Sequence, residues 1–132
     1  MDYTIVTNNP QCYEKYRDRC TVEYDESWTY LDVLVRVRDH VHAGSQIITH
    51  PMAGSLKPNQ TPYRSVVLAA DTIEDKEPFN DLLLIENSID AHNKFMRNRK
   101  LSDWPPEIRR DFQTVDLSLI DGAMTNPVIF RR

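Results

Sequence analysis

Short apolar runs that alternate with helical patterns constrain the fold of this sequence more than any other feature. Runs rich in β-branched and aliphatic residues occur at 3–7, 46–49, 64–70 and 82–85. Each has the length of a buried strand, and a less apolar run at 21–24 adds a fifth candidate. The stretches between them carry apolar residues at helical spacing. Strands that alternate with helices predict a parallel or mixed sheet with helices on both faces.

The first two expected helices are bounded by capping and stop residues. Asn9 followed by Pro10 is a typical helix start, so a helix is expected at 10–19. Ser27 can cap a second helix, whose apolar stripe ends at Gly44. Both helices therefore have a start signal in the sequence.

Two further helices are expected in the second half of the chain. One begins at 86–88 and runs to about Lys100, and another opens at Pro105 and Pro106. The apolar spacing of the last helix predicts a buried face made of Ile108, Phe112, Val115 and Leu119. The chain has 132 residues, the length of one domain. We therefore expect a single three-layer α/β domain over 1–132, with a short, mostly parallel mixed sheet of four to five strands flanked by helices.

Charge and hydropathy exclude two classes of partner. The formal net charge is −4 and the pI is about 5.5, which argues against a general nucleic-acid binder. No apolar run approaches the ~18 residues that a membrane helix needs. The chain opens on a strand-like run, so we expect no signal peptide and a cytoplasmic location. Cys12 and Cys20 would lie about 12 Å apart along one predicted helix, too far for a disulfide, so reduced structural thiols are expected.

Polar groups follow three of the predicted strands. Asn8 follows the first strand, His50 the middle one and Glu86 the late one. In sheets of this kind, ligands bind beyond the carboxyl ends of the strands. If the three strands are parallel, these groups converge on one edge. Two of them lead into helix N-termini, where free N–H groups and the helix dipole favour anions.

The segment 50–63 has no regular periodicity and contains three of the chain's eight prolines. An irregular loop of about 13 residues is uncommon in a compact domain and is often functional. The candidate ligand-binding residues are therefore the polar residues of this loop and of the strand ends: Thr7, Asn8, Asn9, Thr49, His50, Gly54, Ser55, Lys57, Asn59, Thr61, Tyr63, Arg64 and Asn87.

Several of these residues also have a purely structural interpretation. Asn9 is fully explained as a helix cap. His50 can hydrogen-bond its own loop, and Glu86 can be a favourable charge in a first helical turn. Alternatively, a neutral imidazole close to a carboxylate makes an acid–base pair. The sequence leaves both interpretations of His50 and Glu86 open.

Sequence motifs of common cofactor sites are absent. No GxGxxG follows the first strand, so a standard dinucleotide site is not expected. There is no GxSxG nucleophile elbow. The absence of HExxH and CxxC, with only four histidines, makes a dedicated metal site improbable. We therefore expect neither a cofactor nor a metal.

Three segments together resemble the GrdX family: TNNP at 7–10, THPMAGSLKPNQTPYRS at 49–65 and IENSI at 85–89. The middle segment is the specific part of the resemblance. The family consists of small bacterial proteins named for their association with glycine, sarcosine and betaine reductase operons. The resemblance implies a context of amino-acid reductase metabolism. It implies no mechanism and transfers no catalytic residue.

Three functions are compatible with these observations. The favoured one is an accessory or binding protein that recognises a small anionic metabolite or a reductase component, because the motif residues are mostly hydrogen-bonding and loop-shaping types. A second is a structural subunit of a homo-oligomer, in which aromatic residues anchor the contact. The aromatic candidates are Trp28, Tyr63 and Trp104.

The third hypothesis is a small enzyme acting on a small carboxylate or an acyl phosphate. His50 and Glu86 would form its acid–base pair, and Lys57 or Arg64 would neutralise the anionic group of the substrate. This hypothesis requires the imidazole and the carboxylate to meet directly or through one water or substrate atom.

Overall fold

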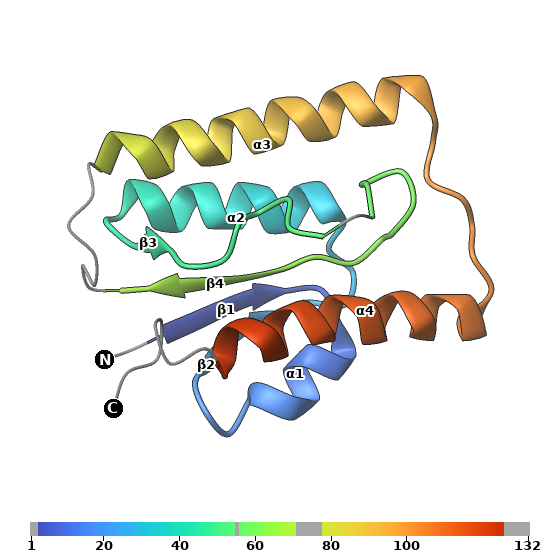
Figure 1. Cartoon of the computed structure of the whole chain (residues 1–132), viewed down its shortest axis with the longest axis horizontal. Helices are drawn as coiled ribbons and strands as arrows, with labels where there is room; N and C mark the ends of the chain where they lie inside the picture. The colour runs from blue at the N-terminus through green and yellow to red at the C-terminus, as the bar shows by residue number, and fades with distance from the viewer. Residues whose placement is uncertain (1–2, 55, 71–77, 126–132) are drawn as a thin grey trace.

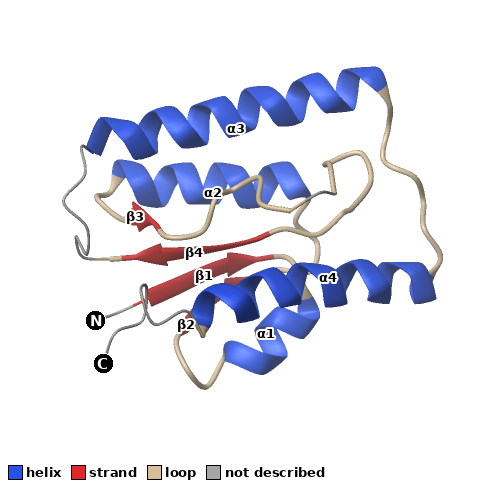
Figure 2. Cartoon of the chain, viewed as in Figure 1, coloured by secondary structure: helices blue, strands red, loops and turns tan. Residues whose placement is uncertain are grey.

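A computed structural model of the chain describes residues 3–54, 56–70 and 78–125, and shows a mixed α/β fold (Figures 1 and 2). Four helices and a four-stranded sheet occur within these residues. The elements follow one another as β1 (Tyr3–Thr7), α1 (Pro10–Tyr16), β2 (Thr21–Tyr24), α2 (Tyr30–His42), β3 (Gln46–Ile47), β4 (Ser65–Ala69), α3 (Pro78–Asn98) and α4 (Pro106–Met124). None of the helices in these ranges is long and apolar enough to cross a membrane.

The sheet is mixed, with the strand order β2-β1-β4-β3. β1 pairs in parallel with β2, whereas β4 runs antiparallel to both β1 and β3. The expectation of a mostly parallel sheet is therefore corrected for the described strands, because only the β1–β2 pair is parallel. Since β1 and β3 both oppose β4, they run in the same direction, and the chain leaving each of them heads toward the same edge.

The expected strand at 82–85 is wrong, because these residues lie inside α3. Ile85 and Ile89 are buried, whereas Leu83 is exposed, which is helical spacing. A short apolar run cannot be assigned to strand or helix by periodicity alone. α3 begins at Pro78, well before 86–88, so residues 86–88 do not form the start of a helix as expected.

Side chains alternate along the central strands and feed a separate core on each face of the sheet. Val6 and Val66 point toward α2, and α3 packs on the outer side of α2 (Figure 1). Ile5 and Val67 point the other way, toward α1 and α4, where Ile120 is also buried. The described helices therefore contribute apolar side chains to a core on each face of the sheet.

Local signals fix most helix starts. Asn9 caps α1 by accepting a hydrogen bond from the backbone of Gln11. The cap of α2 is Thr29 rather than Ser27, and it forms a reciprocal capping box with Asp32.

Two other predictions shift by a few residues. α1 ends at Tyr16, so Cys20 lies beyond the helix and not on it with Cys12. On α4 the predicted Val115 is 44% exposed, while Asp116 is buried. The buried face of α4 is therefore rotated relative to the apolar stripe, which brings a carboxylate inside the protein.

Candidate functional site

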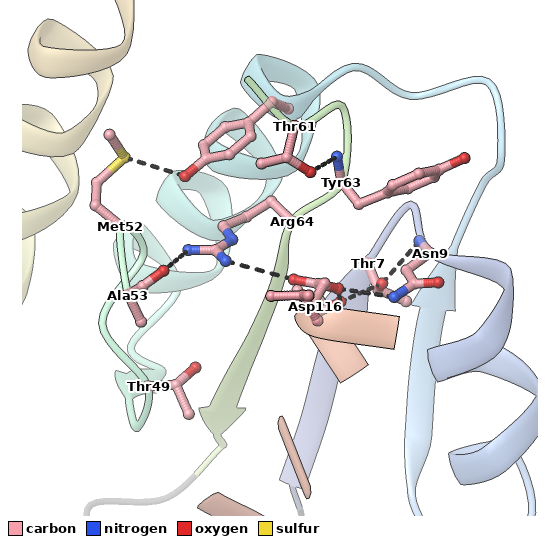
Figure 3. A network of polar contacts seen from close by, with 12 residues as sticks. Thr7, Asn9, Thr49, Met52, Ala53, Thr61, Tyr63, Arg64 and Asp116 are labelled. Carbon is pink, nitrogen blue, oxygen red and sulfur yellow. Dashed lines mark hydrogen bonds and ion pairs between the residues drawn. The ribbon is translucent and has the colours of Figure 1, made fainter. Parts of the chain in front are cut away.

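Four chain segments meet at the edge of the sheet where β1 ends and β4 begins (Figure 3). The end of β1 supplies Asn8 and Asn9, the start of β4 follows Arg64, and the loop 50–64 and helix α4 close the edge from either side. A polar network links these segments, and its charged members are Arg64 and Asp116.

Asn8 holds the loop against the strand. Its side-chain oxygen accepts a hydrogen bond from the backbone N–H of Arg64 at 3.0 Å. Its side-chain nitrogen donates to the carbonyls of Trp28 and Pro62, at 2.9 and 2.8 Å. Asn8 is buried and its amide is engaged at both atoms. Its role in this arrangement is to position the residues around it.

Asn9 performs a similar task for α4. While its oxygen caps α1, its side-chain nitrogen donates to the carbonyl of Gln113 and to Oδ2 of Asp116, both at 2.9 Å. Asn9 is fully buried. The cap interpretation is thus correct but incomplete, because the same amide also joins two helices that are distant in sequence.

Asp116 is the centre of the network, and the sequence analysis did not find it. Its Oδ2 accepts hydrogen bonds from Asn9 and from the hydroxyl of Ser65, the latter at 2.6 Å. The hydroxyl of Thr7 lies 2.6 Å from that of Ser65 and extends the chain of hydrogen bonds. Asp116 is 3% exposed. The available signal was an acidic residue one turn from both Phe112 and Ile120, on the inner side of the last helix.

Arg64 is a buried cation with an unused donor. Its Nη1 donates to the carbonyls of Pro51 and Ala53, at 3.3 and 2.7 Å, and its Nη2 lies 3.4 Å from Oδ1 of Asp116 (Figure 3). The guanidinium also lies 5.4 Å from the ring centroid of Tyr30. Its Nε is buried and has no hydrogen-bond partner in the part of the chain that the structure describes. A buried donor without an acceptor costs free energy, so Arg64 retains spare hydrogen-bonding capacity in this arrangement.

A cavity of about 230 Å³ lies beside Arg64 and Asp116. It is lined by Ala53, Gly54, Leu56, Thr61, Tyr63, Arg64, Phe112, Val115, Asp116 and Leu119. Gly54, Thr61, Tyr63 and Arg64 were predicted from the sequence, whereas the contribution of α4 was not. The volume is below the roughly 300–1,000 Å³ of pockets for drug-sized ligands, so it suits a small metabolite. We call this space the Arg64 cavity.

A second, more open hollow of about 360 Å³ lies between the loop and α3. It brings together His50, Lys57 and Asn87 from the sequence prediction, and we call it the His50 groove. Its full lining is His50, Met52, Leu56, Lys57, Leu84, Asn87, Ser88, Ala91 and Phe95.

His50 and Glu86 have separate partners. Nδ1 of His50 accepts a hydrogen bond from the backbone N–H of Met52 at 2.9 Å. The exposed carboxylate of Glu86 pairs with Arg38 on α2, at 3.5 Å. Neither the His50 groove nor any contact within the described residues joins the imidazole to this carboxylate.

The remaining predicted residues mainly fix the loop. The hydroxyl of Thr49 accepts a hydrogen bond from the N–H of Val67 at the sheet edge, at 2.9 Å. Asn59 donates to the carbonyl of Phe95 at 3.2 Å, and the ammonium of Lys57 lies 5.5 Å from the ring centroid of Phe95. Ser55 lies outside the described residues.

A third hollow of about 530 Å³ is lined only by residues of α3: Asp90, Asn93, Lys94, Met96 and Arg97. Most of these side chains are exposed. Although this hollow is the largest of the three, it lacks the buried charges of the Arg64 cavity.

Possible metal ligands and the thiol of Cys12 are the remaining groups to consider near this site. Among the described residues, no group of three or more His, Cys, Asp or Glu side chains is arranged to hold a metal ion. Burial raises the pKa of the Cys12 thiol to about 12, and the negative charge of Asp116 adds to this effect. Cys12 is therefore a neutral thiol at physiological pH, and a poor nucleophile.

Fold and site together define a small α/β domain with a charge-lined cavity at one edge of a mixed sheet. The family model of the GrdX-like proteins matches residues 4–125 of the 132-residue chain, and the chain belongs to this family. Comparison with curated proteins gives no match, and neither does comparison with solved structures.

Proposed function

We propose that this GrdX-like protein is an accessory protein of amino-acid reductase metabolism that binds a small metabolite in the Arg64 cavity. The ligand carries an anionic group, such as a carboxylate, that Arg64 receives. The observation that carries this proposal is a buried cation in the wall of a metabolite-sized cavity: Arg64 lines the cavity, lies 3.4 Å from Asp116, and has spare hydrogen-bonding capacity among the described residues. A planar guanidinium with a free N–H suits a carboxylate better than any other side chain would.

The alternative of an acid–base enzyme has less support. His50 is engaged by its own loop, and Glu86 by Arg38. Asp116 is held in place by three hydrogen bonds within the described residues, from Asn9, Arg64 and Ser65. The geometry therefore favours recognition over proton transfer.

Family membership supports the metabolic context. The sequence resemblance associates this family with glycine, sarcosine and betaine reductase operons, so these compounds and a reductase component are the first partners to test. The proposal places the protein in the cytoplasm, where Cys12 and Cys20 remain free thiols.

Calorimetry tests the proposal directly. The purified chain is titrated with glycine, sarcosine, betaine, acetyl phosphate and inorganic phosphate, and reductase subunits are tested by pull-down. For any ligand that binds, Val115→Trp should abolish binding, because Val115 lines the cavity from a partly exposed position on α4. Leu83→Trp is the matched control, since Leu83 is 47% exposed on α3 and does not line the cavity.

Two results would refute this function. One is the absence of heat with every compound together with no binding to reductase subunits. The other is an equal loss of binding in the Val115→Trp and Leu83→Trp proteins, which would show that the ligand does not occupy the Arg64 cavity.

A further inference from the structure

The Arg64 cavity contains two buried charges of opposite sign. Arg64 and Asp116 are each 3% exposed. Their closest atoms, Nη2 and Oδ1, are 3.4 Å apart. Charge-assisted hydrogen bonds between such groups are normally about 2.7–2.9 Å long. The two charges are therefore loosely joined, and a third group can bind to either of them.

Each charge also has unused hydrogen-bonding capacity. On Arg64 it is Nε, which shares the edge of the guanidinium that carboxylates commonly occupy. On Asp116 it is Oδ1, whose only hydrogen bond among the described residues is the long one to Arg64, while Oδ2 is taken by Asn9 and Ser65. Because both side chains line the cavity, a ligand there lies beside a cation with a spare donor and an anion with a spare acceptor.

Charge balance decides what kind of ligand can bind to both Arg64 and Asp116. The pair is already neutral overall, so a ligand with only an anionic group would bring net negative charge close to the buried carboxylate of Asp116. Burying an uncompensated charge is costly, whereas a ligand with one positive and one negative group keeps the cavity neutral. We infer that the ligand is a zwitterion of the α-amino acid class, with its carboxylate at Arg64 and its ammonium at Asp116. This inference rests on the function proposed above.

The rest of the lining limits the size and polarity of the side chain of the ligand. Apolar side chains from the loop and from α4 also line the cavity: Leu56, Phe112, Val115 and Leu119. A small aliphatic group buries its surface against such walls, whereas a charged group there would be unpaired. The cavity therefore suits an amino acid with a small aliphatic side chain.

The consecutive asparagines at the end of β1 hold the two charged residues in place. Asn8 binds the backbone N–H of Arg64, and Asn9 binds the carboxylate of Asp116. Because the two asparagines are adjacent in one chain segment, they tie the backbone of Arg64 and the carboxylate of Asp116 to the same end of β1. They are positioning residues and do not themselves need to contact the ligand.

The test compares three compounds of nearly the same shape by calorimetry on the full chain. L-valine carries both charged groups, isovalerate lacks the ammonium and isobutylamine lacks the carboxylate. L-valine is expected to bind about tenfold or more tightly than either analogue, which corresponds to the loss of one charge-assisted hydrogen bond. Asp116→Asn should reduce the preference for L-valine over isovalerate, a change that a purely structural role of Asp116 would not produce.

The outcomes separate this inference from the proposed function. If isovalerate or isobutylamine binds as tightly as L-valine, the zwitterion inference is overturned, although the cavity still binds a ligand. If L-valine gives no heat while acetyl phosphate or phosphate binds, the inference also fails and the proposed function stands. If none of these compounds nor any of the earlier panel binds, and no reductase subunit is captured, both fail. Because the three-compound comparison uses the wild-type chain, it remains decisive even where Asp116→Asn does not fold.

Discussion

The Arg64 cavity and the His50 groove share one loop but differ in how they are built. Leu56 lines both. In the Arg64 cavity the loop faces α4, and the charged side chains are buried and bound from several chain segments. In the His50 groove the loop faces α3, and His50, Lys57 and Asn87 are exposed. The loop therefore separates a fixed, desolvated site from a solvated surface.

This difference shows where electrostatic interactions are strong in the molecule. Between buried charges the effective dielectric constant is low, so their removal or addition has large effects. Exposed charges are screened by water and salt and contribute little. Substitutions on the two sides of the loop should therefore differ sharply in effect.

The largest effect is expected for Asp116→Ala. It leaves the buried Arg64 without its counter-charge and removes the acceptor of Asn9 and Ser65. Breaking a buried pair by removing one partner typically costs about 3–5 kcal/mol. Chemical denaturation should report a loss of this size in the free energy of unfolding. Asp111→Ala, an exposed acidic residue on the same helix, is the control. Equal losses in both variants would show that the network does not stabilise the fold.

A smaller effect should appear at alkaline pH through Cys12. Its thiol has a pKa near 12 in the folded chain, compared with 9.0 for an ordinary thiol, mainly because it is buried. The folded state thus favours the protonated form, and this contribution is complete below pH 9 and is lost as pH rises from about 9 toward 12. The stability of the wild-type chain relative to Cys12→Ala should fall by up to a few kcal/mol over that window.

Cys20→Ala is the control for this experiment, since Cys20 is only half-buried and lies outside α1. Urea unfolding of the three proteins at a series of pH values measures the effect. A constant difference between wild type and Cys12→Ala from pH 8 to 11 would mean that the thiol is not shielded from solvent.

The two regions also differ in how far the sequence predicts them. The strands at 3–7 and 64–70, the helix caps and the irregular loop between β3 and β4 depend on local patterns, and the sequence located them to within a few residues. Gly54, Thr61, Tyr63 and Arg64 are part of that loop, and they line the cavity. Local turn and strand signals are therefore sufficient to locate this half of the site.

The other half depends on packing between elements that are distant in sequence. Asp116 enters the site because α4 packs across the end of β1, a contact between residues about a hundred positions apart. Asp116 is buried because of the orientation of α4. The apolar spacing predicted Val115 on the buried face, one position away from the residue that is buried. The error at 82–85 has a related cause, since the apolar surface of α3 packs mainly against α2. Tertiary contacts therefore determine both the burial of Asp116 and the helical structure of 82–85.

Gly54→Ala should have an intermediate effect and separates backbone strain from the contact with α4. Gly54 has φ +91°, and an added Cβ would lie 3.0 Å from Cδ1 of Leu119, in the wall of the cavity. Gly44 has φ +107° but nothing within 4 Å of its added Cβ. Both alanine variants should lose about 1–2 kcal/mol through the left-handed backbone. Only Gly54→Ala should also weaken ligand binding, by displacing Leu119. Equal ligand affinities in the two variants would show that Gly54 and its contact with Leu119 do not form part of the binding site.

The smallest effects are expected for His50→Ala and Glu86→Gln. His50 is exposed, and Glu86 forms only a partly exposed ion pair with Arg38. Surface changes of this kind usually alter the free energy of unfolding by less than about 0.5 kcal/mol, and an exposed ion pair contributes at most about 1 kcal/mol. Ligand affinity at the Arg64 cavity should stay at the wild-type value in both variants, because neither side chain lines it. A tenfold or greater loss of affinity in either variant would move the functional site to the α3 side of the loop and reopen the acid–base hypothesis, since neither side chain lines the Arg64 cavity.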